Sequence, residues 1–345
     1  MKAATTAILA CLLWSLPPFQ PVSAQVVVSR TVYLMGTRTT LAVRTADRNE
    51  ARRQLERMVR SLEQTDAELS TWRADSELGV LNQQPVGQSF GISAPLCRMW
   101  PELTAWYDET GKTFDPTIGA LIDAWGLRRG GRVPSPAQLS AARVLTGFDH
   151  FDFDAVECRV TRKVHASLDA GAFGKGAGLR RLQRDYGGAS APWLVDLGGQ
   201  VAVSERPVAN AWPVAIAHPD RRDEVAIEIR LAGGSLATSG GSERSWVIAG
   251  QGVSHILDPR TGRPVNRRGS VSVWHQDPLV ADVLSTALYV MGPEEGLRYA
   301  EANGLAVLFL ADAPESDRAA VVTRASHLFR QLFLTADSSG VPSGS

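Results

Sequence analysis

The order in which predicted strands and helices follow one another constrains the fold of this chain most strongly. Short β-branched or apolar runs, bounded by Gly, Pro and Asp, occur in the second half of the chain. They span residues 193–197, 212–217, 225–231, 244–249, 270–274 and 305–310. Helical patterns at about 172–186, 278–291 and 293–303 lie among them. Because hairpin-like strand neighbours mix with helices, the sequence predicts an α+β fold rather than a doubly wound parallel sheet.

Two helices are predicted in the first half of the chain. Asp47 followed by Glu50 matches the capping-box pattern, and apolar residues then recur at helical spacing as far as Leu69. A second helix is predicted over about 95–110. Pro101 lies inside it and should remove one backbone hydrogen bond or bend the helix.

The composition excludes some classes of protein. Lys and Arg number 36 and Asp and Glu number 36, so a protein held on nucleic acid by its net charge is disfavoured. With 44% hydrophobic residues, the chain can bury at least one large core. We find neither a linker nor a fixed repeat, so one catalytic unit is expected over 25–335, with a disordered Ser- and Gly-rich tail at 336–345.

Residues 1–24 have the pattern of an export signal. Lys2 precedes an apolar run, and Val22-Ser23-Ala24 offers a small-x-small cleavage site. Pro17 ends the apolar run well short of the ~20 residues that span a bilayer. We therefore expect a cleaved signal peptide and an exported chain, with a membrane anchor or lipidation at Cys11 as the less favoured alternatives.

Two cysteines remain after this segment. Cys97 and Cys158 could pair in an oxidising compartment. They lack the CxxC spacing and the nearby histidines of a metal site. The sequence leaves their pairing open, and we expect both to behave as small buried apolar residues.

Asp282 and Thr286 stand four residues apart in a predicted helix. Residues at i and i+4 share a helix face, so this carboxylate and this hydroxyl can point at one hard cation such as Mg²⁺. Taken alone the pair is weak evidence, because acids near helix starts and back-bonded threonines are common.

Asp169 begins a Gly-rich turn that ends near Lys175. Such a turn lets backbone amides and carbonyls approach a ligand, and the lysine can meet phosphate oxygens. The spacing matches neither the P-loop nor the GxGxxG fingerprint, so this stretch alone favours a structural turn. The stretches 237–241 and 254–262 also resemble turns, and His255 by itself is more often structural than catalytic.

Eight stretches in the same order resemble the FAD:protein FMN transferase family, also called ApbE. They are 35–37, 69–82 (with Leu69-Ser70-Thr71-Trp72, Asp75-Ser76-Glu77-Leu78 and Leu81-Asn82), 114–127, 169–176, 195–199, 237–240, 255–262 and 281–287. The resemblance covers about residues 31–310, and the ordered set is far more specific than any single stretch. It implies an α+β core of the T-fold-like kind.

The resemblance implies an activity as well. Members of this family transfer FMN from FAD to a Thr hydroxyl of an acceptor protein, which forms a phosphoester and releases AMP, and they use Mg²⁺. They are typically exported, so the chain is expected in the periplasm, either free or at the inner membrane. The implied acceptors are flavin-carrying subunits of membrane redox complexes or small periplasmic electron carriers, and no nucleic acid is implied.

The resemblance also implies roles for single residues. Asp282 and Thr286 would bind the metal through side-chain oxygens and Ala172 through its main-chain carbonyl. His255 would orient or deprotonate the incoming hydroxyl. The positions that match FAD contacts are Met35, Trp72, Thr113, Phe114, Asp115, Asp169, Lys175 and Ile256. Among these, Trp72 and Phe114 could pack against the flat rings of FAD.

The sequence departs from the family pattern at two places, and two alternative functions stay open. Aromatic residues that family members often carry are missing from Gly241-Ser242-Glu243 and from Lys175-Gly176-Ala177, which could change FAD affinity. The same site with water as the acceptor would be an Mg²⁺-dependent FAD pyrophosphatase. A non-catalytic exported FAD-binding protein is a further alternative, although such a carrier needs no metal at the scissile phosphates.

Overall fold

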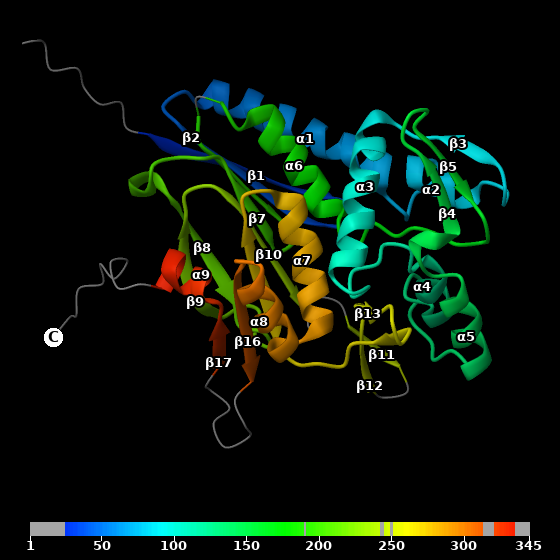
Figure 1. The fold of residues 1–345 in the computed structure, drawn as a ribbon. Coiled ribbons are helices and arrows are strands. Elements are labelled where there is room, and N and C mark those ends of the chain that lie inside the picture. The colour runs from blue at the N-terminus through cyan, green and yellow to red at the C-terminus, as the bar shows by residue number, and fades with distance from the viewer. Residues whose placement is uncertain (1–24, 190, 242–244, 249–250, 313–320, 335–345) are drawn as a thin grey trace, which may run out of the picture.

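An antiparallel sheet of eight strands forms the centre of the computed structural model, which describes residues 25–189, 191–241, 245–248, 251–312 and 321–334 (Figure 1). The strand order is β1-β2-β6-β7-β10-β15-β16-β17. The bounds are β1 Val26–Leu34, β2 Thr37–Thr45, β6 Trp193–Leu197, β7 Gln200–Val203, β10 Gly234–Gly240, β15 Ser270–His275, β16 Ala306–Asp312 and β17 Val321–Ala325. The predicted signal peptide, including Cys11, and the tail at 336–345 lie outside the described residues.

Helices cover one face of this sheet (Figure 1). They are α1 Arg48–Leu69, α6 Gly174–Tyr186, α7 Pro278–Met291 and α8 Pro293–Ala302. The hairpin of β8 (Trp212–Ala217) and β9 (Val225–Leu231) packs its apolar residues with those of the opposite face, together with α9 (His327–Phe329). An apolar layer lies on each face of the sheet, so successive side chains along a strand are buried on opposite faces. The expected α+β class is therefore confirmed.

A smaller lobe lies beside the sheet, at the right of Figure 1. It contains the helices α2 Glu77–Gln83, α3 Ala94–Glu109, α4 Gly119–Trp125 and α5 Pro136–Val144, and the three-stranded sheet of β3 Ser89–Gly91, β5 Arg159–Arg162 and β4 Phe151–Asp154. Two short hairpins, β11 Ser245–Ile248 with β12 Gln251–Ser254 and β13 Leu257–Asp258 with β14 Arg263–Pro264, complete this side. The remaining short turns are η1 Phe148–His150, η2 Val208–Asn210 and η3 Arg330–Leu334.

The helix predictions in the first half are confirmed, with one difference. Asp47 caps α1 by accepting hydrogen bonds from the backbone amides of Asn49 and Glu50. Glu50 does not complete a capping box, because its carboxylate pairs with Arg53 and Arg57 instead. The helix α3 continues through Pro101.

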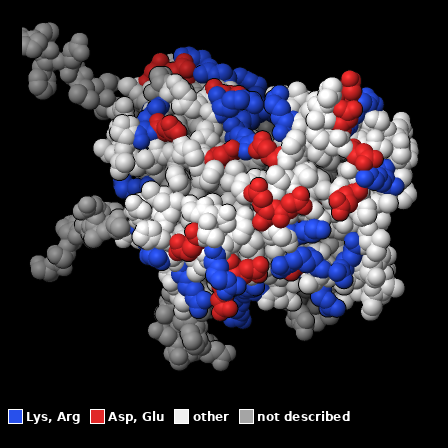
Figure 2. Space-filling model, in the orientation of Figure 1, with Lys and Arg blue, Asp and Glu red and all other residues white. Residues whose placement is uncertain are grey.

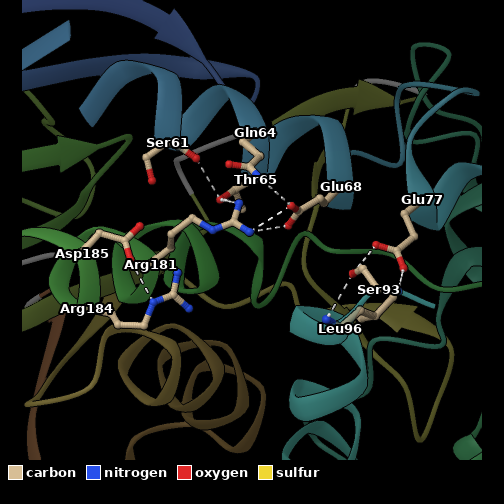
Figure 3. A network of polar contacts seen from close by, with 10 residues as sticks. All are labelled: Ser61, Gln64, Thr65, Glu68, Glu77, Ser93, Leu96, Arg181, Arg184 and Asp185. Carbon is tan, nitrogen blue, oxygen red and sulfur yellow. Dashed lines mark hydrogen bonds and ion pairs between the residues drawn. The ribbon is translucent and has the colours of Figure 1, made fainter. Parts of the chain in front are cut away.

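Polar contacts join α1 to α6 and α2 to α3 (Figure 3). Arg181 of α6 donates to both carboxylate oxygens of Glu68 in α1, at 2.8 and 2.9 Å, and to the hydroxyl of Thr65 at 3.0 Å. Ser93 caps α3 and donates its own hydroxyl proton to Glu77 of α2 at 2.7 Å. The first set of contacts fastens two helices of the layer that covers the sheet, and the second fastens two helices of the lobe.

Elsewhere, acidic and basic side chains intermingle on the face that Figure 2 shows. No described helix is long and apolar enough to cross a membrane.

The sequence expectations were wrong for one stretch and incomplete for others. Residues 237–241 were expected to form a turn, but 234–240 form the strand β10 in the middle of the sheet. Small residues suit this position because α7 packs closely against it: Ser239 and Ser285 lie 2.9 Å apart between their hydroxyl oxygens. The hairpin of β1 and β2 was also missed, although Met35 and Gly36 form its turn with φ of 50° and 71°.

Cys97 and Cys158 form a disulfide, which corrects the expectation of two separate apolar residues. Cys97 lies in the first turn of α3, and Cys158 lies between β4 and β5, so the bond fastens the small sheet to α3 within the lobe. The pairing could not be predicted because 61 positions separate the two cysteines and the intervening fold brings their Cα atoms to 5.4 Å.

Removing this disulfide is expected to lower the free energy of unfolding by about 4 kcal/mol, because the crosslink restricts a long loop of the unfolded chain. Urea unfolding with and without a reductant measures the difference. The double variant Cys97→Ala/Cys158→Ala should be less stable and should no longer respond to the reductant. Equal stability of the wild type in both conditions would contradict the crosslink.

Candidate functional site

Two adjoining cavities, with volumes of about 240 and 160 Å³, lie between the main sheet and the lobe. Trp72, Asp169, Gly171, Lys175 and His255 line both of them. The first cavity also contacts the turn between β1 and β2 and the end of α1. The second reaches α4, β10 and α7. Segments that are far apart in the sequence therefore meet at one place.

The structure gathers eleven of the twelve predicted site residues around these cavities. Met35, Trp72, Asp169, Lys175 and His255 line the first cavity, and Trp72, Thr113, Asp115, Asp169, Ala172, Lys175, His255, Ile256, Asp282 and Thr286 line the second. Phe114 is the exception: its side chain is fully buried in the core cluster that contains Phe173 and Val283. Its ring therefore lines neither cavity, and a contact of Phe114 with FAD stays a prediction.

Asp282 is held on α7 by the start of α6. The backbone amide of Gly176 donates to Oδ2 of Asp282 at 2.7 Å. A Cβ at position 176 would lie 2.6 Å from the carbonyl oxygen of Pro278 and 2.7 Å from Cβ of Asp282, so this close approach requires glycine. Burial raises the pKa of Asp282, and the positive charge of Lys175 and the amide of Gly176 oppose that rise.

The donors beside Asp282 suit a hard cation. Thr286 follows one turn later on α7, and both residues line the second cavity together with Ala172. One carboxylate, one hydroxyl and a nearby backbone carbonyl are the oxygen donors that Mg²⁺ takes when substrate phosphates complete its shell. Among the described residues, no three or more His, Cys, Asp or Glu side chains lie together as a possible metal site. The described residues therefore form no zinc site of the usual His and Cys kind.

Lys175 adds positive charge between the two cavities. Its Nζ lies 3.5 Å from the carbonyl oxygen of Gly198 in the turn between β6 and β7. Gly198 has φ of 60°, and a Cβ there would lie 2.3 Å from Oγ1 of Thr37. The two hairpin turns thus pack against each other, and Lys175 of α6 reaches one of them beside both cavities.

Asp169 accepts hydrogen bonds from three donors. The hydroxyl of Thr71 and Nη2 of Arg128 donate to Oδ2, at 2.9 and 2.6 Å, and the amide of Gly171 donates to Oδ1 at 2.8 Å. Sequence reasoning missed Arg128, which lines the second cavity, and Arg222, which lines the first. No local signal distinguishes Arg128 from the arginine that follows it.

His255 lies between two structural turns. The hydroxyl of Ser254 accepts from the amide of Ile256 at 3.1 Å. Asp258 and Arg260 pair with each other at 2.9 to 3.1 Å within the following turn. The acid and the guanidinium of this stretch therefore shape the turn, and His255 lines both cavities.

Asp115 is a buried acid at the wall of the second cavity. Burial raises its pKa from an ordinary 3.8 to about 6, although the amide and hydroxyl of Thr117 donate to Oδ1 and Lys112 contributes positive charge. The folded chain thus holds a proton at this position between about pH 4 and 6, where the unfolded chain has lost it.

The effect of this proton on stability is expected to show in the pH dependence of the Asp115→Asn variant. Because the folded state binds more protons than the unfolded state in this window, the contribution of Asp115 to stability falls as pH rises, by about 3 kcal/mol in total. The free energy of unfolding of Asp115→Asn relative to the wild type should therefore increase by about that amount between pH 4 and 7. Urea unfolding at a series of pH values measures it. Asp108→Asn, at an exposed position of α3, should show no such trend.

Comparisons with known proteins agree with this geometry. The family model described as ApbE family matches residues 35–309. An FAD:protein FMN transferase of Vibrio cholerae is 33% identical over 73% of this chain and 77% of that protein. One from Haemophilus influenzae is 28% identical over 79% and 81%.

Solved structures of similar proteins superpose on this chain over most of its length. The flavinyl transferase ApbE of Pseudomonas stutzeri, in its apo form, superposes with a TM-score of 0.78 at 29% identity, over 91% of this chain and 99% of that one. The ApbE protein of Thermotoga maritima superposes with a TM-score of 0.79 at 26% identity, over 89% and 99%.

Proposed function

The chain belongs to the ApbE family of FAD:protein FMN transferases, and we propose that it transfers FMN from FAD to a Thr hydroxyl of an exported acceptor protein in the presence of Mg²⁺. One observation carries this proposal: Asp282 and Thr286 on α7, Lys175 on α6 and His255 before β13 line adjoining cavities, although they are far apart in the sequence. Export is proposed on the predicted signal peptide at 1–24.

In the proposed reaction, the acceptor hydroxyl oxygen bonds to the phosphorus of the FMN half of FAD. The bond from that phosphorus to the bridging oxygen breaks, AMP leaves with the bridging oxygen, and the hydroxyl loses its proton. Such transfers depend on placing the two oxygens in line and on stabilising charge at the phosphate. A bound Mg²⁺ supplies positive charge at the pyrophosphate.

The residues of this chain supply the remaining functions. Asp282, Thr286 and Ala172 would hold the cation. Lys175 places a positive charge beside both cavities, where the pyrophosphate of FAD would span them. His255, which lines both cavities, would orient the acceptor hydroxyl and accept its proton. Trp72 is 63% exposed at the shared rim, so its ring can pack against a flat ring of FAD.

The test is an incubation of the mature chain with FAD and Mg²⁺, with and without a Thr-containing acceptor. AMP release and acceptor mass are followed together. We expect the acceptor to gain one FMN for each AMP released. AMP and free FMN without acceptor would instead indicate a pyrophosphatase, and FAD that stays bound and unchanged under every condition would indicate a carrier.

A further inference from the structure

The carboxylate of Asp169 connects two walls of the site that are far apart in sequence. Thr71, at the end of α1, and Arg128, after α4, both donate to the same oxygen. The side chain of Asp169 is 13% exposed and that of Arg128 24%. A short charge-assisted hydrogen bond that is largely shielded from water is stronger than an ion pair on the surface.

Asp169 in turn holds the segment that leads into α6. Its own amide donates to the carbonyl oxygen of Pro116 at 2.7 Å, and its Oδ1 accepts from Gly171. The next residues close a tight turn, in which the amide of Gly174 donates to the carbonyl oxygen of Ala170 at 2.7 Å. Ala172 and Lys175, the proposed metal and phosphate contacts, stand on this segment.

Arg128 is presented from a loop that is tied to α4. Gly126 ends this helix with φ of 62°, and Nε of Arg132 donates to the carbonyl oxygen of Ala124 at 2.8 Å. Nη1 of Arg128 also lies 3.5 Å from Oδ1 of Asp123. The same helix and loop place Ile122 in the wall of the second cavity.

We propose that Arg128 is a positioning residue for the transfer reaction, acting through Asp169 to hold the segment 170–175 against the α4 wall. This proposal rests on the proposed function, because positioning the segment matters for catalysis only if the chain transfers FMN. Loss of such a supporting contact typically weakens metal affinity or activity by about 10- to 100-fold. Arg128→Ala should therefore weaken Mg²⁺ binding by roughly 10-fold or more, and it should also weaken FAD binding.

Arg129→Ala is the matched control. This neighbouring arginine is exposed, and its guanidinium forms no hydrogen bond or ion pair with any described residue. The full chain is compared in three measurements: FAD affinity without metal by flavin fluorescence, Mg²⁺ affinity by calorimetry, and urea unfolding. Arg129→Ala should match the wild type in all three. Arg128→Ala should remain folded under the conditions of the binding assays, with some loss of stability, while it loses affinity.

Two further measurements separate positioning from other roles. In a double-mutant cycle with Asp169→Asn, the effects of the two substitutions should fail to add. Additive effects would mean that Arg128 acts without Asp169 and would overturn the proposal. Ethylguanidinium at millimolar concentration should restore the affinities of Arg128→Ala, and neutral ethylurea should not. Equal failure of both additives would favour a general loss of structure.

The two hypotheses fail separately. If the wild type transfers FMN and Arg128→Ala keeps wild-type affinities and rates, the positioning role is wrong and the proposed function stands. If the wild type binds FAD and Mg²⁺ but transfers no FMN, the proposed function is wrong, and the binding constants alone decide the role of Arg128.

Discussion

Replacing Asp282 by asparagine is expected to lower the rate of FMN transfer by about 10³-fold or more, while the fold stays intact. The amide oxygen of asparagine can still accept the hydrogen bond from Gly176, whose amide donates to Oδ2 at 2.7 Å. It carries no charge, and a divalent cation held by a single carboxylate then loses its strongest ligand. Loss of cation-based charge stabilisation worth about 4 kcal/mol corresponds to a rate change of this size.

Although transfer by Asp282→Asn should be slower, the thermal stability of its metal-free form should not fall. Burial raises the pKa of Asp282, so the ionised carboxylate is disfavoured in the metal-free chain. A neutral amide avoids this penalty, and without metal the variant should unfold at the same temperature as the wild type or higher. Added Mg²⁺ should raise the unfolding temperature of the wild type and leave that of the variant unchanged.

Asp277→Asn provides the matched control on the same helix. Asp277 caps α7 and pairs with Arg180 at 2.6 and 2.7 Å, and it lines neither cavity. This variant should lose some stability but keep both transfer and the response to Mg²⁺. Transfer by Asp282→Asn at more than a tenth of the wild-type rate would show that the metal site lies elsewhere.

Replacing His255 by alanine is expected to lower the rate of transfer by about 10²- to 10⁴-fold, which is the usual contribution of a positioned acid or base. FAD should remain bound, because ten or more other residues line the cavities and Lys175 is retained. The measurement combines FAD affinity by fluorescence with acceptor mass over time. His255→Gln tests the role further, since glutamine can form hydrogen bonds but does not accept the proton.

His165→Ala, at an exposed position in the lobe, is the control and should behave as the wild type in both assays. If His255→Ala transferred FMN at a normal rate, a role in deprotonating the hydroxyl would be excluded. If it lost FAD affinity and transfer in equal measure, His255 would be a binding residue instead.

Much of the local structure could be predicted from the sequence. The helix that begins after Asp47, and the helix that carries Asp282 and Thr286, follow from caps and apolar spacing within a few residues. The strand at 234–240 could not be recognised, because its Gly, Ser and Thr residues resemble a turn. They form a strand because the neighbouring strands supply its hydrogen bonds and α7 covers it.

The site was predicted less completely than the helices. The resemblance supplied the residues that line the cavities, but the sequence placed the ring of Phe114 there, and the structure buries it in the core. It also offered no sign that Arg128 pairs with Asp169, 41 positions later, because its sequence neighbour Arg129 has the same chemistry. The disulfide of Cys97 and Cys158 was left open because 61 positions separate the two cysteines.

The sequence by itself determined the longer helices to within a few residues and the face of α7 on which Asp282 and Thr286 stand, and its ordered stretches carried the family resemblance. The helices and their faces depend on hydrogen bonds and side-chain spacing within one or two turns of the chain. The tertiary structure decided which segments meet: Gly176 with Asp282 across 106 positions, and Thr71 with Asp169 across 98. Such contacts form only when the apolar faces of the whole sheet and its helices are buried together, and no short stretch of sequence records that packing.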